Sequence, residues 1–236
     1  MEHGLTVFIP VYNEEPILEK NVRTVVDCVT KFGLPFEVVV GSNGSTDRTV
    51  EIGEALAKAD PRVVFFHVPE RGPGRAFAEG VRRARYDCFV TLDADLSFDM
   101  KFVDDALAGL AANDAVVGSK GLGTQKRSWM RIVASNTFIR LTNLLLGMPY
   151  RDYSIGAKGY RTESIRPYLH KVDVHTFYTQ QMLFELTRAK KRIVEIPVQC
   201  EDRRASRFNL LHEGFYRYGK LFALWFRSFF DQHRQS

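Results

Sequence analysis

Short apolar segments alternate with segments of helical spacing through the first half of this chain, and this alternation limits the possible folds. Five segments have the length and composition of strands: Leu5–Val11, Phe36–Val40, Val63–His67, Cys88–Leu92 and Ala115–Val117. The segments between them have helical spacing: Glu15–Phe32, a helix capped by Ser45 or Thr46 that runs to Ala59, Arg75–Ala84 and Phe102–Ala112. Such alternation predicts an α/β fold with a mainly parallel sheet flanked by helices on both faces.

The second half is less regular. Its predicted elements are a helix over Trp129–Leu146, a strand over Ile155–Tyr160, a helix over Thr179–Ala189, a strand over Ile193–Val198 and a long, basic, amphipathic final helix over Phe208–Phe230. No internal repeat, low-complexity tract or long linker separates the two halves. We therefore expect a single domain over residues 1–236, with a specialised C-terminal portion.

Charge is distributed unevenly between the two halves. Residues 1–118 contain 12 Lys and Arg against 19 Asp and Glu, whereas residues 119–236 contain 21 against 9. The acidic half is suited to hold a cation, and the basic half is suited to face phosphates or an anionic membrane. Helix-turn-helix, RNP-type and zinc-finger patterns are absent from the sequence, so no nucleic-acid partner is expected.

Cysteine content and hydropathy exclude further classes of protein. The chain has 3 cysteines, which are too few and too scattered for a disulfide framework or a zinc site. The longest run without Asp, Glu, Lys or Arg is 11 residues, whereas a membrane-spanning helix needs about 20. The sequence therefore predicts no transmembrane helix and no signal peptide, and it favours a cytoplasmic location.

The segment Thr91-Leu92-Asp93-Ala94-Asp95-Leu96-Ser97 carries the clearest chemical signal. A predicted buried strand ends here in two carboxylates, Asp93 and Asp95, at the edge where parallel sheets bind ligands. Carboxylate and diphosphate oxygens are hard ligands suited to Mg²⁺ or Mn²⁺. The pattern predicts a metal–diphosphate site, and the alternative is a capping turn before the helix that follows.

Polar residues and glycines follow the other predicted strands as well. The first strand leads into Tyr12-Asn13-Glu14-Glu15, the second into residues 41–49, and the third into Glu70-Arg71-Gly72-Pro73-Gly74-Arg75. Gly72 and Gly74 allow backbone to approach a phosphate, and Arg71 or Arg75 can pair with it. Each segment alone is also explained by an ordinary strand end, an N-cap or a glycine-rich turn.

Together, FIPVYNEE, SNGSTDRT, RGPGRAFAEG and LDADLS resemble the family 2 glycosyltransferases, inverting enzymes of the Rossmann-like GT-A fold that use nucleotide sugars and a divalent metal. The resemblance covers residues 1–118 and implies that they form the nucleotide-sugar-binding half. Together with the strand-end chemistry, it implies donor contacts from Pro10, Tyr12, Glu14, Ser42, Asp47, Arg71, Arg75, Asp93, Ala94 and Asp95, and metal contacts from Asp93, Asp95 and Ser97. The family usually has an acidic pair or Asp-Asn where this chain has Ser42-Asn43, and the closer group often has Gln at Ser97.

Segments of the second half indicate the chemical class of the acceptor substrate. GSK at 118–120, RIVASN at 131–136, DYSIGAKGYR at 152–161 and RRASR at 203–207 resemble the dolichyl-phosphate mannose synthase group, which includes glucosyl-transferring relatives acting on polyprenyl phosphates. The resemblance implies that Lys120, Arg131 and Ser135 hold the lipid phosphate, within an acceptor-binding half over 119–236. Arg131 and Ser135 are four residues apart and can share one face of a helix. Arg203 and Arg207 lie in a basic loop that either closes over the phosphates or is simply solvated.

The final predicted helix combines aromatic and basic side chains. Residues 215–230 contain 8 of the 29 aromatic residues, with Arg217, Lys220 and Arg227 among them. Such a helix is typical of a membrane interface, and packing on the sheet or against an oligomer partner are the alternatives. We expect peripheral association with the cytoplasmic face of a membrane, directly or through a separate anchoring subunit.

The expected reaction is inverting transfer of a hexose, mannose or glucose, from GDP-mannose or UDP-glucose to a polyprenyl phosphate, with Mg²⁺ or Mn²⁺ as cofactor. Asp95, Arg131 and Asp152 are the candidate catalytic residues. A phosphate acceptor is already ionised and needs no general base, so Asp152 would organise the acceptor loop. A hydroxyl acceptor would require a base, for which Asp152 is the candidate. A transferase acting on a sugar or glycan hydroxyl and a catalytically weak nucleotide-sugar-binding subunit are the alternatives.

Overall fold

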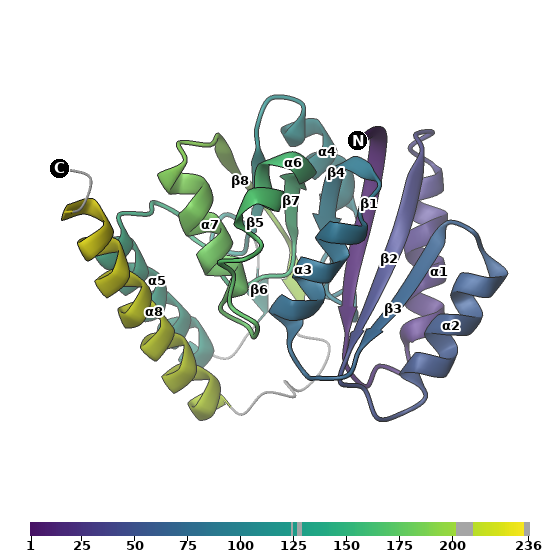
Figure 1. The fold of residues 1–236 in the computed structure, drawn as a ribbon, viewed down its shortest axis with the longest axis horizontal. Helices are drawn as coiled ribbons and strands as arrows, with labels where there is room; N and C mark the ends of the chain where they lie inside the picture. The colour runs from purple at the N-terminus through teal and green to yellow at the C-terminus, as the bar shows by residue number, and fades with distance from the viewer. Residues whose placement is uncertain (124, 127–128, 202–209, 234–236) are drawn as a thin grey trace.

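The structure is a computed structural model that describes residues 1–123, 125–126, 129–201 and 210–233. Its centre is a sheet of seven strands in the order β3-β2-β1-β4-β7-β5-β8 (Figure 1). These strands are β1 (Glu2–Val11), β2 (Phe36–Asn43), β3 (Val63–Val68), β4 (Tyr86–Thr91), β5 (Ala115–Ser119), β7 (Lys158–Arg161) and β8 (Ile193–Pro197). Within this sheet β7 alone is antiparallel to its neighbours, so the predicted mainly parallel sheet is confirmed. A separate pair joins β6 (Gln125–Lys126) to β9 (Cys200–Glu201).

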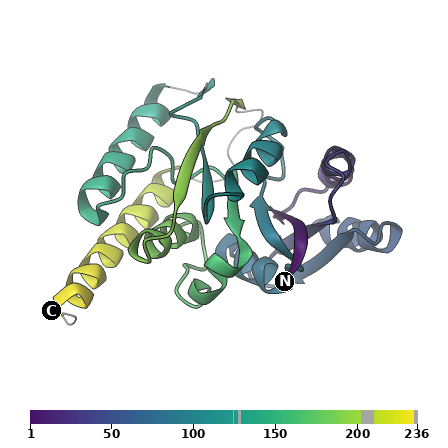
Figure 2. The ribbon, with the colours of Figure 1, turned by 90° about the horizontal axis from the view of Figure 1, so that it is seen from above.

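Helices cover both faces of the sheet, as Figure 2 shows in the turned view. The covering helices are α1 (Leu18–Thr30), α2 (Thr49–Ala59), α3 (Pro73–Arg83), α4 (Lys101–Leu110), α6 (Thr162–Ile165) and α7 (Tyr178–Arg188). Buried side chains of α1, α2 and α4 form the core on one face. Those of α3, α6 and α7 form the core on the other face. The α/β architecture expected from the alternation of strands and helices is therefore confirmed.

The alternation of side chains along β1 explains how both faces come to be covered. Leu5, Val7 and Ile9 point into the core shared with α1 and α4, whereas Phe8 points into the opposite core. All four side chains are at most 1% exposed. Successive strand residues face opposite sides of a sheet, and burying one such side chain stabilises the fold by about 1.5–3 kcal/mol. A strand covered on both sides therefore needs a continuous apolar run.

Helices α5 (Trp129–Leu146) and α8 (Leu210–His233) lie side by side at the end of the sheet far from β3 (Figure 1, Figure 2). The ring of Phe138 on α5 meets that of Tyr218 on α8 edge to face, with centroids 5.1 Å apart. Leu221 and Leu224 of α8 are buried in a third core cluster with side chains of α7. In the described part of the chain, no helix is long and apolar enough to cross a bilayer.

The carboxyl ends of the parallel strands meet at one edge of the sheet, the lower edge in Figure 1. The N-terminus lies at the opposite edge. Loops after β1, β2, β3 and β4 leave the lower edge, and residues 152–157 reach it just before β7, which starts opposite the end of β4. Ligands of such sheets bind at this edge, so its loops are where the candidate site is expected.

Strand β7 starts later than the predicted segment Ile155–Tyr160. Residues 152–157 form a loop instead, closed by the Asp152 carboxylate, which accepts the N–H groups of Ser154 and Ile155 at 2.9 and 3.2 Å. Asp side chains that bond to nearby backbone favour turns over strands. The paired strand therefore begins at Lys158.

The start of α2 also differs from the prediction. The helix begins at Thr49, and neither Ser45 nor Thr46 caps it. The Asp47 carboxylate accepts the Thr49 N–H at 3.0 Å instead, while the two predicted caps bond to the loop after β1. Helix α6 and the 3-10 turn η1 (Arg166–Tyr168) were not among the expected elements.

Candidate active site

Side-chain hydrogen bonds join the loops that follow β1 and β2. The Asn13 side-chain oxygen accepts the N–H of Thr46 at 2.7 Å, and the Asn13 N–H donates to Ser45 Oγ at 3.1 Å. The Asp47 carboxylate accepts the N–H of Glu15 at 3.2 Å. Asn13 has a φ of 53°, a left-handed conformation that Asn tolerates better than most residues. The loop after β1 is thus held firmly against the loop that carries Asp47.

Pro10, Tyr12 and Glu14 lie at the end of β1 and in the loop after it. Pro10 is paired in register with Gly41 of β2. The guanidinium of Arg71, from the loop after β3, lies over the Tyr12 ring at 4.1 Å from its centroid. A cation this close to an aromatic face is attracted by the ring. The fold therefore brings together two residues, from different loops, that were predicted to contact the nucleotide sugar.

The Ser42-Asn43 pair links the ends of three strands. The Asn43 side chain donates to the Val11 carbonyl at 2.8 Å and accepts the N–H of Gly72 at 3.1 Å. Ser42 Oγ lies 3.0 Å from Nδ1 of His67. Both side chains of the pair are at most 3% exposed. These two residues, at which the sequence departs from the family pattern, therefore have structural partners, and the Ser42 hydroxyl lies inside the protein.

Gly72 and Gly74 serve a contact that is not evident from the sequence. A Cβ at Gly74 would lie 1.9 Å, and one at Gly72 would lie 2.7 Å, from backbone carbonyl oxygens of the segment 173–175. The close approach that these glycines permit is thus to another part of the chain. Arg75 donates its N–H to the same segment at 3.1 Å, and its guanidinium pairs with Glu70 at 3.1 Å.

The two carboxylates of the predicted metal–diphosphate motif follow β4. Asp93 accepts the N–H of Gly156 at 3.2 Å, and Asp95 accepts the N–H of Ser97 at 3.0 Å. Burial and then the neighbouring Asp95 raise the pKa of Asp93, although Lys120 and the Gly156 amide oppose this rise. Like-charged carboxylates in one site disfavour each other's ionisation, and a cation placed between them would relieve that repulsion.

The residues present fit a divalent cation that is completed by substrate. Among the described residues, no group of three His, Cys, Asp or Glu side chains could hold a metal ion. Asp93 and Asp95 offer hard oxygen ligands and leave the remaining positions to diphosphate or water, as Mg²⁺ commonly requires. Ser97, the third predicted metal ligand, is half-buried and follows Asp95 by two residues.

The loop before β7 holds a buried cluster of charges. Asp152 is 2% exposed, and its carboxylate lies 3.4 Å from the Lys120 ammonium. Burial acts to raise the pKa of Asp152, but Lys120, Lys158 and the Ser154 N–H hold it below its ordinary value. Lys158 is 1% exposed, and burial lowers its pKa to about 8 against the opposing effect of Asp152. Two predicted acceptor-half residues, Lys120 and Asp152, are therefore adjacent, and Lys120 is near enough to Asp93 to act on its pKa.

Helix α5 has the predicted limits and carries Ser135, which is half-buried. Arg131 lies one turn earlier on the same helix, and its side chain is outside the described part of the structure. Arg203 and Arg207 also lie outside the described residues.

Three residues that shape this site were not among the predicted ones. Asn21 of α1 donates to the Ala94 carbonyl at 2.8 Å and so supports the loop after β4. A Cβ at Gly156 would lie 2.1 Å from Oδ1 of Asp93, so only glycine leaves room for that carboxylate. A lysine within a predicted buried strand is the signal that could have identified Lys158. The contacts of Asn21 and Gly156 join distant segments and leave no local pattern.

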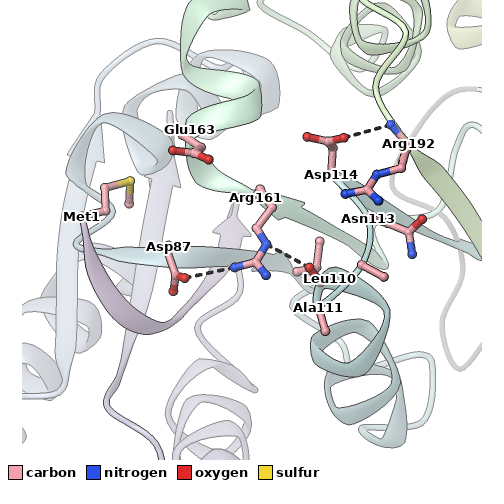
Figure 3. A pocket seen from close by; sticks show the side chains of 10 residues that line it. Met1, Asp87, Leu110, Ala111, Asn113, Asp114, Arg161, Glu163 and Arg192 are labelled. Carbon is pink, nitrogen blue, oxygen red and sulfur yellow. Dashed lines mark hydrogen bonds and ion pairs between the residues drawn. The ribbon is translucent and has the colours of Figure 1, made fainter.

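A separate pocket of about 320 Å³ lies at the opposite edge of the sheet and is shown in Figure 3. Three of its charged side chains, those of Asp87, Asp114 and Arg161, are bonded within the protein. Arg161 donates to Asp87 at 3.0 Å and to the Leu110 carbonyl at 2.9 Å. The N–H of Arg192 donates to Asp114 at 2.9 Å. These internal contacts explain the polar lining, and the pocket is remote from the carboxylates that follow β4.

Helix α8 presents an aromatic surface, defined here as Phe215, Phe222, Trp225, Phe226 and Phe229. Exposed fractions range from 38% for Trp225 to 80% for Phe215, so packing on the sheet does not account for these rings. Two of the basic residues predicted to face lipid have acidic partners on the protein. Arg217 donates to Glu213 at 2.8 Å, and Lys220 pairs with Asp173 at 2.9 Å.

Comparison with known proteins connects this geometry to a family. The model of glycosyl transferase family 2 matches residues 6–169. Glycosyltransferase AglD of Haloferax volcanii is 32% identical over 218 residues, covering 89% of this chain and 35% of the relative. The undecaprenyl-phosphate 4-deoxy-4-formamido-L-arabinose transferase of Pseudomonas aeruginosa is 31% identical over 179 residues, covering 73% of this chain and 51% of the relative. The chain thus spans between about a third and a half of the length of these two curated relatives.

Solved structures share the architecture. Glucosyl-3-phosphoglycerate synthase of Mycobacterium tuberculosis, in complex with uridine diphosphate, matches with a TM-score of 0.70 at 17% identity, covering 94% of this chain and 79% of that one. The same enzyme with Mn²⁺, UDP-glucose and phosphoglyceric acid matches with a TM-score of 0.67 over the same shares at 16% identity. The expected GT-A fold is thereby confirmed. Because the family model matches more than half of the sequence, this chain belongs to glycosyl transferase family 2.

Proposed function

We propose that this chain transfers a hexose, mannose or glucose, from a nucleoside diphosphate sugar to a polyprenyl phosphate, with inversion at the anomeric carbon. The observation that carries this proposal is the hydrogen bond from the Gly156 N–H to Asp93. It brings the metal–diphosphate motif next to the loop 152–157, whose Asp152 pairs with Lys120. A donor-side anionic pair thus lies beside a buried cation suited to a second phosphate. The acceptor named for the Pseudomonas relative, undecaprenyl phosphate, supports the same acceptor class.

Residues 1–118 form the nucleotide-sugar-binding half in this proposal. GDP-mannose and UDP-glucose are the donors considered, and the UDP-glucose complex of the mycobacterial neighbour supports a uridine nucleotide. The connected loops after β1, β2 and β3 form one continuous rim that is suited to a nucleotide. The proposed contacts on this rim are Pro10, Tyr12, Glu14, Asp47, Arg71 and Arg75, followed by Asp93, Ala94 and Asp95. Ser42 is buried beneath the rim and supports it through the hydrogen bond from its hydroxyl to Ser45.

Residues 119–236 form the acceptor-binding half. The second pKa of a phosphate monoester is about 6, so the acceptor is mostly dianionic at neutral pH and attacks without a general base. The Asp152 carboxylate is engaged by Lys120 and by the Ser154 N–H, and its pKa is lowered, which supports a role in organising the loop. The proposed contacts of the acceptor phosphate are Lys120, Arg131, Ser135, Arg203 and Arg207.

Catalysis then depends on positioning and electrostatics. A bound Mg²⁺ or Mn²⁺ at Asp93 and Asp95 would neutralise charge on the departing nucleoside diphosphate. Lys120 and Arg131 hold an acceptor phosphate oxygen in line with the anomeric carbon, on the face opposite the leaving group. Such positioning supplies up to about 7–11 kcal/mol of a barrier. A bond forms between that oxygen and the anomeric carbon while the bond to the diphosphate breaks, which inverts the centre.

The aromatic surface of α8 is proposed to lie in the interface of the cytoplasmic face of a membrane. Helix α8 begins at the same lower edge of the molecule as the candidate active site (Figure 1). A helix with exposed aromatic rings binds in the headgroup region, where a polyprenyl phosphate presents its phosphate. This direct contact is our proposal, and attachment through a separate anchoring subunit is the alternative.

A transfer assay tests the proposed reaction. Radiolabelled GDP-mannose, UDP-glucose and a UDP-pentose are supplied in parallel with a short polyprenyl phosphate in detergent, with Mn²⁺, Mg²⁺ or EDTA. The matched control acceptor is the corresponding polyprenol, which has the same chain and a hydroxyl in place of the phosphate. The matched control protein is Asp95→Asn, which we expect to lose turnover by about 10²–10³-fold because leaving-group stabilisation is lost.

The outcomes separate the alternatives. Metal-dependent label in lipid from a hexose donor, with the phosphate acceptor alone, supports the proposal and identifies the preferred donor. Label from the UDP-pentose alone would overturn the hexose assignment. Nucleotide release that requires a glycan acceptor would point to a hydroxyl acceptor and make Asp152 the base. Binding of the nucleotide sugar without any lipid labelling or nucleotide release would favour a nucleotide-sugar-binding subunit.

A further inference from the structure

Lys158 is a buried lysine that the proposed reaction does not use. It begins β7, where it is paired with Thr91 of β4 on one side and Val117 of β5 on the other. Its side chain is 1% exposed. Removing an ammonium from water is unfavourable unless ion pairs and hydrogen bonds compensate. The contacts of this ammonium should therefore reveal why a cation is placed here.

Those contacts lie in the loop 152–157 and at Asp93. The Lys158 ammonium donates to the Ile155 carbonyl. Asp152 and Asp93 both favour its charged form, whereas burial and Lys120 oppose it. The ammonium is thus within electrostatic reach of two carboxylates, Asp152 in the loop 152–157 and Asp93 of the metal–diphosphate motif.

A single peptide group connects the ammonium to Asp93. The carbonyl of Ile155 and the N–H of Gly156 belong to one planar peptide unit. Lys158 bonds to the oxygen end of this unit, and the N–H end donates to Oδ2 of Asp93 at 3.2 Å. Ammonium, peptide and carboxylate form a chain in which each hydrogen bond polarises the next and strengthens it.

The space around this peptide permits little rearrangement. A Cβ at Gly156 would lie 2.1 Å from Oδ1 of Asp93, which shows how closely the carboxylate sits against the backbone. The Gly156 carbonyl is held as well, because the Thr91 hydroxyl donates to it. Rotation of the peptide before Gly156 would therefore displace Asp93 or remove its amide donor.

We propose that Lys158 is a positioning residue that orients Asp93 through the Ile155–Gly156 peptide and so links the acceptor loop to the metal–diphosphate site. Its place in catalysis rests on the proposed function, whereas its effect on Asp93 is independent of the acceptor. Replacing a group that orients a metal ligand through hydrogen bonds typically lowers metal affinity or activity about 10–100-fold. Lys158 is expected to act within that range.

Three variants test this role. Lys158→Met keeps the length of the side chain and removes the charge, and Lys158→Arg keeps a cationic donor of larger size. Thr162→Val is the matched control: it removes the hydroxyl of a residue that is 0% exposed and donates to the Tyr86 carbonyl at 2.8 Å, at the far edge of the sheet.

Binding of Mn²⁺ in the presence of UDP is the first measurement. We expect Lys158→Met to weaken it about 10–100-fold, Lys158→Arg to recover part of this loss, and Thr162→Val to match wild type. In the transfer assay, kcat should fall by a similar factor in Lys158→Met, and the KM for the donor should rise. A folded Lys158→Met with wild-type Mn²⁺ affinity and kcat would overturn the proposal.

The Gly156 amide resonance decides the matter if Lys158→Met does not fold. Protein labelled with ¹⁵N-glycine reports this amide, which is assigned by its loss in Gly156→Ala. In Lys158→Arg the amide should shift and exchange faster with solvent, because the larger guanidinium cannot take the ammonium's place without moving the peptide. An unchanged resonance in Lys158→Arg would refute the proposal. A wild-type protein without lipid transfer would contradict the proposed function alone, since this resonance tests Lys158 separately.

Discussion

Replacing Gly156 with alanine tests whether the close contact between the loop 152–157 and Asp93 affects activity. A Cβ at Gly156 would lie 2.1 Å from Oδ1 of Asp93, whereas real Cβ contacts stay beyond 3.0 Å. Gly156 is not among the glycines with positive φ, so alanine adds a steric conflict without backbone strain. The carboxylate or the loop must then move by about 1 Å. A displacement of this size can lower a rate about 10²-fold, and overpacking typically costs about 1–3 kcal/mol.

The assay measures kcat, Mn²⁺ affinity and Tm on the same preparations. We expect Gly156→Ala to lose about 10²-fold in kcat, to bind Mn²⁺ more weakly and to melt several degrees lower. Gly109→Ala is the matched control, because its Cβ would lie 2.7 Å from a Val116 methyl group in the core beneath α4. It should lose stability and retain turnover. Wild-type kcat and Mn²⁺ affinity in Gly156→Ala would refute the inferred role of this contact.

Three further predictions address other parts of the molecule. Asp152→Asn should lower kcat by less than about 10²-fold and raise the KM for the acceptor; a loss of up to about 10⁴-fold at constant KM would instead identify a general base. Burial acts to raise the pKa of Asp47, but hydrogen bonds from Thr49 and Glu15 outweigh this effect and hold the pKa below its ordinary value. The ionised carboxylate therefore stabilises the folded state above about pH 3.9. This stabilisation is lost as the pH falls through the lower pKa of the folded state. Asp47→Asn should therefore lower the urea midpoint at pH 7, and the difference from wild type should shrink below about pH 4. Combining Phe226→Ser with Phe229→Ser should reduce sedimentation with anionic phospholipid vesicles at least about tenfold; unchanged sedimentation would exclude the aromatic surface of α8 as the membrane contact.

The strand and helix pattern could be predicted because it depends on neighbouring residues. The apolar run of β1 requires cover on both faces, and the predicted helix over Trp129–Leu146 matches α5. The direction of β7 could not be predicted in this way. Its antiparallel position between β4 and β5 follows from pairing with strands that lie far away in the sequence.

Some features of the candidate site could likewise be predicted from the sequence, and others could not. Asp93 and Asp95 are recognisable because two carboxylates follow a predicted buried strand. The glycines at 72 and 74 are recognisable as a turn, but their observed contact is with the backbone of 173–175, about a hundred residues later. A local pattern shows that glycine is needed there and does not show what approaches it.

Local composition and period were therefore sufficient for the α/β alternation and for the carboxylates at a strand end, since both involve residues within a few positions of each other. The charge cluster around Lys158 is different in kind. Lys120 and Asp152 are 32 residues apart, and Asp93 and Gly156 are 63 residues apart. These interactions form only when β7 lies beside β4 in the folded sheet. Hydrogen bonds and charge–charge interactions between these groups are strong only where the folded chain excludes water.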